Sequence, residues 1–243
     1  MSLPSLAELP GILLPFVTRA EQSFRAAVEA LDDDHGLSSW TPERWAQFAR
    51  VTAASDFVIE QSIRDPLMLL ALVQSGELDR GFAPGELCAQ IAAAVNAAQT
   101  EDELGRVLRR QRTRHQVRII WRDLTRQADL IQTCRDLSDM ADARIDQAYQ
   151  WLYSRHCQQF GVPTGRRSGE PQQMVILGMG KLGAVELNLS SDIDLIFAYP
   201  EGGETVGAKR ALDNHEFFIR VGQRLIKALD AMTVDGFVFR VDM

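Results

Sequence analysis

The stretch GMGKLGAVELNLSSDIDLIFAYP, residues 178–200, decides how the second part of the sequence folds. The apolar residues just before it, MVIL at 174–177, run into glycines and predict a strand. The run DIDLIFAY at 192–199 predicts a second strand, which Pro200 stops. Two short strands joined by a glycine-rich turn are therefore expected here.

The second predicted strand carries two carboxylates on one face. Side chains alternate along a strand, so Asp192 and Asp194 share one face while Ile193 and Leu195 can enter the core. Two carboxylates about 6 to 7 Å apart repel each other, which indicates a cation between them. The alternative reading is a strand end whose aspartates merely face water.

The glycines match the pattern G-x-G-x-x-G at Gly178, Gly180 and Gly183, which suggests a dinucleotide site. Only the short segment 184–191 separates them from the aspartates, too little for the crossover helix of a Rossmann unit. A P-loop is excluded as well, because Lys181 is not followed by Ser or Thr. What remains is a turn whose backbone N–H groups can bind phosphate oxygens.

Further along, residues 200–210 read as a polar loop and 212–231 as an amphipathic helix. Residues 236–242 read as a closing strand that ends in a third carboxylate, Asp242, on the same face as Arg240. A glycine turn, two aspartates on one strand and a third on a neighbouring strand are typical of a two-metal nucleotidyl-transfer site.

The sequence before this region is helical. Thr41-Pro42, Ser55 and Asp65-Pro66 each place a capping side chain ahead of a helix, and Thr100 with Glu103 fits a capping box. Gly, Pro and Ser accumulate at 161–172, which marks a linker. We therefore predict an α+β chain with a helical domain at 1–160, a linker at 161–172 and a nucleotidyltransferase domain at 173–243.

The long predicted helix from residue 101 to about 126 carries arginines at every fourth position. The next helix, about 136–160, offers aspartates. Pairing between the two helices, with the arginine stems packed on apolar surface, is the structural interpretation of the stripe. Contact with a phosphate or an acidic partner is the alternative.

Composition excludes several classes of protein. The 243 residues are 46% hydrophobic and 24% charged, which excludes disorder for most of the length. A net charge of −7 excludes a broad positive field, so no nucleic-acid partner is expected. No long apolar run or basic leader is present, so we expect no membrane partner and a cytoplasmic location. Three widely spaced cysteines imply neither a disulfide framework nor a structural zinc.

The residues also resemble a known family. Segments 176–201, 212–230 and 235–243 look like the nucleotidyltransferase domain in the N-terminal half of the bifunctional glutamine synthetase adenylyltransferases and adenylyl-removing enzymes. Weaker resemblance extends forward through 108–124 and 55–66, so nearly the whole chain is covered.

The resemblance implies a polymerase-β-like fold behind the helical domain and a role in bacterial nitrogen control. It implies Mg²⁺ bound by Asp192, Asp194 and Asp242, which would be both metal ligands and catalytic residues. It also implies a phosphate-side or nucleotide-binding turn, with the site residues Gly178, Gly180, Lys181 and Ser191.

The activity implied for this half is phosphorolysis of adenylyl-tyrosine on glutamine synthetase, giving ADP and the unmodified enzyme. The site pattern alone leaves the opposite direction open, which is ATP-dependent adenylyl transfer by the same carboxylates. A silent helical module that docks glutamine synthetase or a PII signalling protein is the third possibility. The family continues beyond its third carboxylate, so we expect this sequence to be a truncated fragment whose activity is weak or lost.

Overall fold

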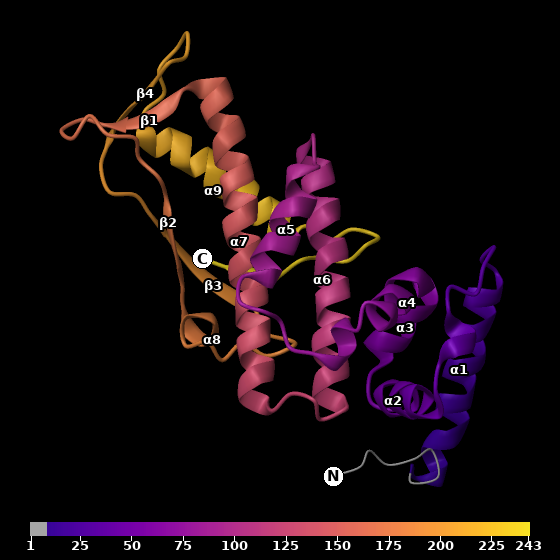
Figure 1. The fold of residues 1–243 in the computed structure, drawn as a ribbon. Coiled ribbons are helices and arrows are strands. Elements are labelled where there is room, and N and C mark those ends of the chain that lie inside the picture. Colours follow the sequence, from indigo (N-terminus) through magenta and orange to yellow (C-terminus); the bar gives the residue numbers. More distant parts are fainter. Residues whose placement is uncertain (1–8) are drawn as a thin grey trace. The chain divides into compact units, whose positions relative to one another are not determined.

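The computed structural model describes residues 9–243, so the first eight residues of the predicted helical domain lie outside the described part. Helices dominate up to Phe160, and short strands alternate with helices after it (Figure 1). The α-helices are α1 (Leu14–Glu29), α2 (Pro42–Thr52), α3 (Asp56–Arg64), α4 (Pro66–Gln74), α5 (Glu86–Asn96), α6 (Glu101–Leu124), α7 (Leu130–Phe160), α8 (Gly180–Gly183) and α9 (Asn214–Asp230). The strands are β1 (Val162–Gly165), β2 (Val175–Gly178), β3 (Ile193–Ala198), β4 (Gly203–Val206) and β5 (Val241–Asp242). Single turns of 3₁₀ helix occupy Gly11–Leu13, Leu37–Ser39 and Glu77–Asp79. The predicted α+β class is confirmed.

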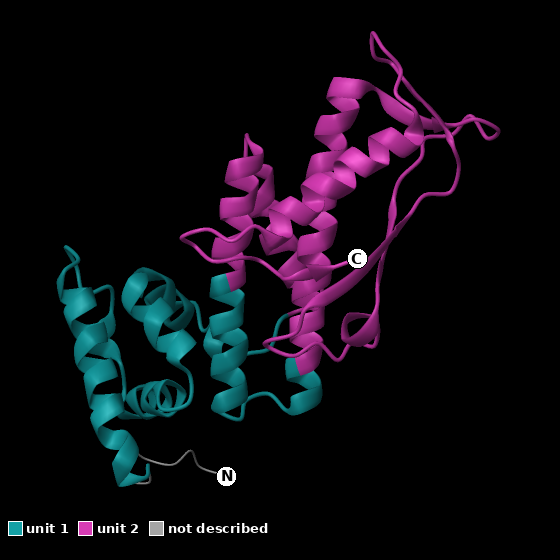
Figure 2. Ribbon diagram, turned by 180° about the vertical axis from the view of Figure 1, so that it is seen from behind, with its two compact units in different colours: residues 1–82, 113–133 teal, residues 83–112, 134–243 magenta. Residues whose placement is uncertain are grey.

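The chain forms two compact units (Figure 2). Unit 1 contains residues 1–82 and 113–133, and unit 2 contains residues 83–112 and 134–243. This division reflects which residues pack together, whereas the boundary predicted at 161–172 was placed where the amino-acid composition changes. The predicted domain boundary therefore stays a prediction.

Unit 1 is helical in part because its sequence places capping side chains at the starts of helices. Thr41 Oγ1 accepts a hydrogen bond from the backbone N–H of Arg44, Ser55 Oγ from that of Val58, and Asp65 Oδ1 from that of Met68. The helices predicted after these caps are confirmed. Their apolar faces meet in a buried aromatic core, in which the rings of Phe24 and Phe48 stack 5.2 Å apart.

The arginine stripe of α6 is partly buried in unit 1 around one carboxylate. Arg114 Nη2 lies 2.6 Å from Glu77 Oε1, and the fully buried Arg118 reaches Glu77 Oε2 at 3.3 Å. Arg118 Nε also donates to the backbone carbonyl of Glu77 at 2.9 Å. The burial of these arginines agrees with a structural role for this part of the stripe. The predicted partner was wrong for Arg114, because it pairs with Glu77 and not with an aspartate of 136–160.

Unit 2 contains two small sheets. Strands β2, β3 and β5 form one sheet in that order, with β2 antiparallel and β5 parallel to β3. Strands β1 and β4 form the other, with Val162 opposite Val206. The linker predicted at 161–172 and the loop predicted at 200–210 thus each contain a strand, because each satisfies the other's backbone groups. That part of both predictions was wrong.

Helix α9 packs against Phe197 of β3 and against strands β1, β4 and β5. Its apolar stripe of Phe218, Val221, Leu225 and Leu229 is buried, as its spacing predicted. Gly222 allows close approach to the sheet, because a Cβ there would lie 3.0 Å from the Phe197 ring. Helix packing therefore fixes one face of β3 and leaves the opposite face for other groups.

Candidate active site

Two of the predicted carboxylates are neighbours across adjacent strands. Asp194 on β3 and Asp242 on β5 are register partners in the parallel pair. Ile193 and Leu195 are buried while Asp194 is exposed, so the predicted alternation is confirmed. Since paired residues of neighbouring strands point to the same side, Asp194 and Asp242 share the outer face of the sheet.

The glycine turn lies directly against Asp194. The backbone N–H of Met179 donates to the carbonyl of Asp194 at 2.8 Å. Gly180 has a φ of +53°, and a Cβ built on it would lie 3.0 Å from Asp194 Oδ2. A Cβ on Gly183 would lie 2.5 Å from the carbonyl oxygen of Gly178, so the turn closes only with glycine there. The glycines therefore bring the first turn of α8 next to a carboxylate.

Two polar anchors on α7 hold the ends of this turn. Tyr149 Oη accepts a hydrogen bond from the backbone N–H of Met174 at 2.7 Å, just before β2. Ser138 Oγ accepts one from the N–H of Leu187 at 3.2 Å, after the turn. Burial raises the pKa of Tyr149 to about 12, which keeps its hydroxyl protonated at neutral pH. The turn is thus tied to the long helix on both sides.

Asp192 lies just before β3 and is paired with a basic residue. Arg240 Nη2 donates to Asp192 Oδ1 at 2.5 Å and to the backbone carbonyl of Ser190 at 2.8 Å. Sequence reasoning placed Arg240 on the face of Asp242 but assigned it no role. The signal that pointed to it was its position two residues before the third carboxylate. Arg240 neutralises one of the predicted metal ligands in this structure.

The remaining predicted site residues are less closely connected to the carboxylates. Ser191 Oγ donates to Asn188 Oδ1 at 2.8 Å, within a tight turn ahead of β3. Lys181 is exposed on α8, one residue after Gly180. Their contact with phosphate stays a prediction.

Three carboxylates, those of Asp192, Asp194 and Asp242, are the predicted ligands of a divalent cation. Exposed carboxylates on adjacent strands supply the hard oxygen ligands that Mg²⁺ prefers. Within residues 9–243, however, no three His, Cys, Asp or Glu side chains converge closely enough to hold a metal. The pairing of Asp192 with Arg240 is consistent with this, because it engages one of the three carboxylates. Asp194 and Asp242 have the chemistry and the neighbouring register of cation ligands, whereas Asp192 is engaged by Arg240, so Mg²⁺ binding by all three stays a prediction.

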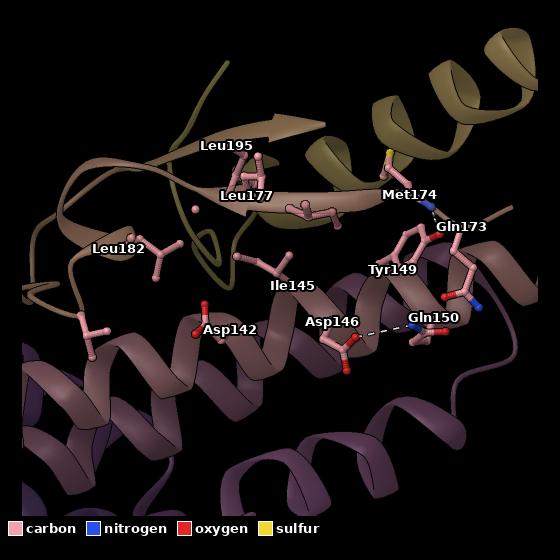
Figure 3. A pocket seen from close by; sticks show the side chains of 14 residues that line it. Asp142, Ile145, Asp146, Tyr149, Gln150, Gln173, Met174, Leu177, Leu182 and Leu195 are labelled. Atoms are coloured by element: carbon pink, nitrogen blue, oxygen red, sulfur yellow. Dashed lines mark hydrogen bonds between the residues drawn. The ribbon is translucent and has the colours of Figure 1, made fainter. Parts of the chain in front are cut away.

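A cavity of about 600 Å³ lies on the other side of the turn (Figure 3). Leu182 and Leu195 contribute apolar surface, while Asp142 and Asp146 of α7 supply carboxylates. Burial raises the pKa of Asp142, with Asp139 adding repulsion. Because Leu195 lines this cavity and Asp194 alternates with it, the cavity and the predicted carboxylates lie on opposite faces of β3.

Comparison with known proteins identifies the family. The family model described as glutamate-ammonia ligase adenylyltransferase matches residues 45–243. The chain belongs to this family. The resemblance drawn from the motifs is thereby confirmed.

Curated relatives agree with this membership. The chain is 74% identical over 245 residues to a bifunctional glutamine synthetase adenylyltransferase/adenylyl-removing enzyme of Pseudomonas syringae pv. tomato. It is 67% identical over 245 residues to the protein of that name from Pseudomonas aeruginosa, and 66% over 243 residues to that from Pseudomonas putida. Each match covers all of this chain and 25% of the relative, so the chain spans about a quarter of their length.

Within the described residues 9–243, none of the helices combines the length and the apolar character needed to cross a bilayer.

Proposed function

We propose that the chain carries an adenylyl-removing site that acts on glutamine synthetase by phosphorolysis of adenylyl-tyrosine. The observation that carries the proposal is the register pair of Asp194 and Asp242, with Gly180 in contact range of Asp194. A phosphate-binding turn beside paired carboxylates is the arrangement that nucleotidyl transfer needs. The names of the relatives, which include both adenylyl transfer and removal, support the substrate.

In the proposed reaction, an oxygen of inorganic phosphate attacks the α-phosphorus of adenylyl-tyrosine. A new P–O bond forms, the bond to the tyrosine oxygen breaks, ADP leaves and the tyrosine oxygen takes up the proton that the attacking phosphate loses. The first-turn N–H groups of α8 would orient phosphate oxygens, and Lys181 would supply positive charge beside them. Asp192, Asp194 and Asp242 would hold Mg²⁺, which when bound neutralises charge on the phosphoryl oxygens.

Two further functions remain candidates. The same carboxylates would serve ATP-dependent adenylyl transfer to glutamine synthetase, since the geometry of the site is common to both directions. A silent module would instead use the helical part to dock glutamine synthetase or a PII signalling protein. Phosphate, ADP and ATP are the small-molecule partners that separate these possibilities.

One experiment distinguishes the three. Adenylylated glutamine synthetase is incubated with the chain, phosphate and Mg²⁺, and ADP release is followed. ADP that forms with the wild type and not with Asp194→Asn supports adenylyl removal. Labelling of unmodified glutamine synthetase by ATP supports the transfer direction, and no reaction in either assay supports the silent module.

A further inference from the structure

A second recess of unit 2, here called the α6–α9 cleft, gathers basic side chains away from the candidate active site. It has a volume of about 360 Å³ and lies between the start of α6 and the C-terminal half of α9. Its cations are Arg106, Arg109, Arg224 and Lys227, and its carboxylates are Glu101 and Asp102. Four cations in one recess of a protein with net charge −7 call for an explanation.

Internal ion pairs account for only part of this charge. Arg224 is bound to Glu101, which ties α9 to α6. Arg109 is buried, and burial lowers its pKa while nearby Asp235 opposes the shift. Arg106 and Lys227 take part in no ion pair with the described residues. Two cations on two different helices therefore face the cleft without a protein carboxylate bound to them.

Gly105 also indicates that the shape of the cleft is specific. It lies inside α6, where glycine lowers helix stability relative to alanine. It also lines the cleft, and a Cβ built on it would lie 3.1 Å from Arg109 Nη1. The missing side chain leaves room for the guanidinium of Arg109 at the cleft wall.

We propose that the α6–α9 cleft binds a small oxyanion, a phosphate or a dicarboxylate, between Arg106 of α6 and Lys227 of α9. Guanidinium groups match the planar oxygens of carboxylates and phosphates, and a lysine adds a mobile point charge. Arg109 adds positive charge at the wall behind Arg106. The site is separate from the proposed active site, because neither the predicted carboxylates nor the glycine turn lines it.

The test is calorimetric titration of the chain with inorganic phosphate and, separately, with malonate. Arg106→Ala and Lys227→Ala are compared with the wild type, and Arg110→Ala is the matched control because Arg110 is exposed on the same helix but does not line the cleft. Each cleft variant is expected to weaken binding about tenfold, since one charge-assisted hydrogen bond is lost. Circular dichroism checks that each variant is folded.

Phosphate has two proposed sites, so a second variant separates them. Lys181→Ala removes the charge at the glycine turn and is expected to leave malonate binding unchanged. Preference for phosphate or for malonate identifies the ligand class. Equal affinity of Arg106→Ala and the wild type, an equal loss in Arg110→Ala, or no binding of either anion up to millimolar concentration would overturn the proposal.

Discussion

Asp194 and Asp242 lie side by side on the neighbouring parallel strands β3 and β5, 48 residues apart in the chain. Neither side chain could be brought there by its own strand alone. The pair depends on the sheet that β2, β3 and β5 form together, and it concentrates negative charge on one exposed face.

Replacing Asp194 by Asn should abolish nucleotidyl chemistry while leaving the fold intact. Removing one of two neighbouring like charges relieves repulsion, so the melting temperature without metal should hold or rise. Turnover should fall by about a hundredfold or more, because charge stabilisation in the reaction is lost. Glu186→Gln, at an exposed position near the turn, is the control for a nearby loss of charge. A clear drop in the melting temperature of Asp194→Asn without Mg²⁺ would show that the carboxylate is structural.

Replacing Arg240 by Ala should raise the affinity of the site for Mg²⁺, because Asp192 is then free to bind the cation. The ion pair is half-exposed, with side chains 57% and 48% accessible, so its loss should cost at most about 1 kcal/mol of stability. The corresponding gain in metal affinity should reach up to about fivefold. Arg220→Ala, which breaks a similarly exposed pair with Glu216, should leave metal affinity unchanged. Weaker Mg²⁺ binding in Arg240→Ala would mean that Arg240 positions Asp192 and does not compete for it.

Replacing Glu77 by Ala should destabilise unit 1 strongly. The change leaves the buried guanidinium of Arg118 without its carboxylate, a loss worth about 3 kcal/mol or more. Asp79→Ala is the matched control, because Asp79 is half-exposed and its pair with Arg44 contributes less than about 1 kcal/mol. Urea unfolding followed by tryptophan fluorescence measures both. Similar midpoints for the two variants would show that the other partners of Arg118 satisfy its guanidinium without Glu77.

Acidification should weaken the fold through His156. Its ring is buried, Nδ1 lies 2.8 Å from the carbonyl of Leu152, and burial lowers the pKa of the imidazole below its ordinary 6.5. His156 therefore binds a proton more tightly in the unfolded chain than in the folded one. The free energy of unfolding should keep its full value above about pH 6.5 and should fall as the pH drops through that value and below. Melting temperatures of the wild type and His156→Asn are compared from pH 8 to pH 5. The variant should show the shallower decline, and parallel curves would contradict the assignment.

Local signals in the sequence predicted the helices well. The cap at Thr41 and the prolines at 42 and 66 act within one helical turn, so their effect needs no knowledge of the rest of the fold. The alternation of side chains along β3 predicted equally well that Ile193 and Leu195 would be buried and Asp194 exposed. Both signals depend only on neighbouring residues.

Pairing across long distances was missed. Strand β4 forms by pairing with β1, with Gly203 opposite Gly165. Nothing within residues 200–210 indicates that partner strand. The closing strand predicted at 236–242 shrinks to Val241–Asp242, because the N–H groups of Val238 and Phe239 both donate to the carbonyl of Leu229 instead. The pair of Arg240 with Asp192 was missed for the same reason, since it joins two segments that are distant in sequence.

The bonds from the N–H groups of Val238 and Phe239 to the carbonyl of Leu229 make strand β5 dependent on helix α9. A two-residue strand offers too few ladder bonds to find its register unaided, and parallel pairing with β3 requires a crossover. Helix α9 supplies that crossover, and Asp230 Oδ1 at its end accepts a bond from the N–H of Val241 at 3.4 Å. The register of β5, and with it the position of Asp242, should therefore depend on α9, so a change that loosens the end of α9 should displace this carboxylate from the site.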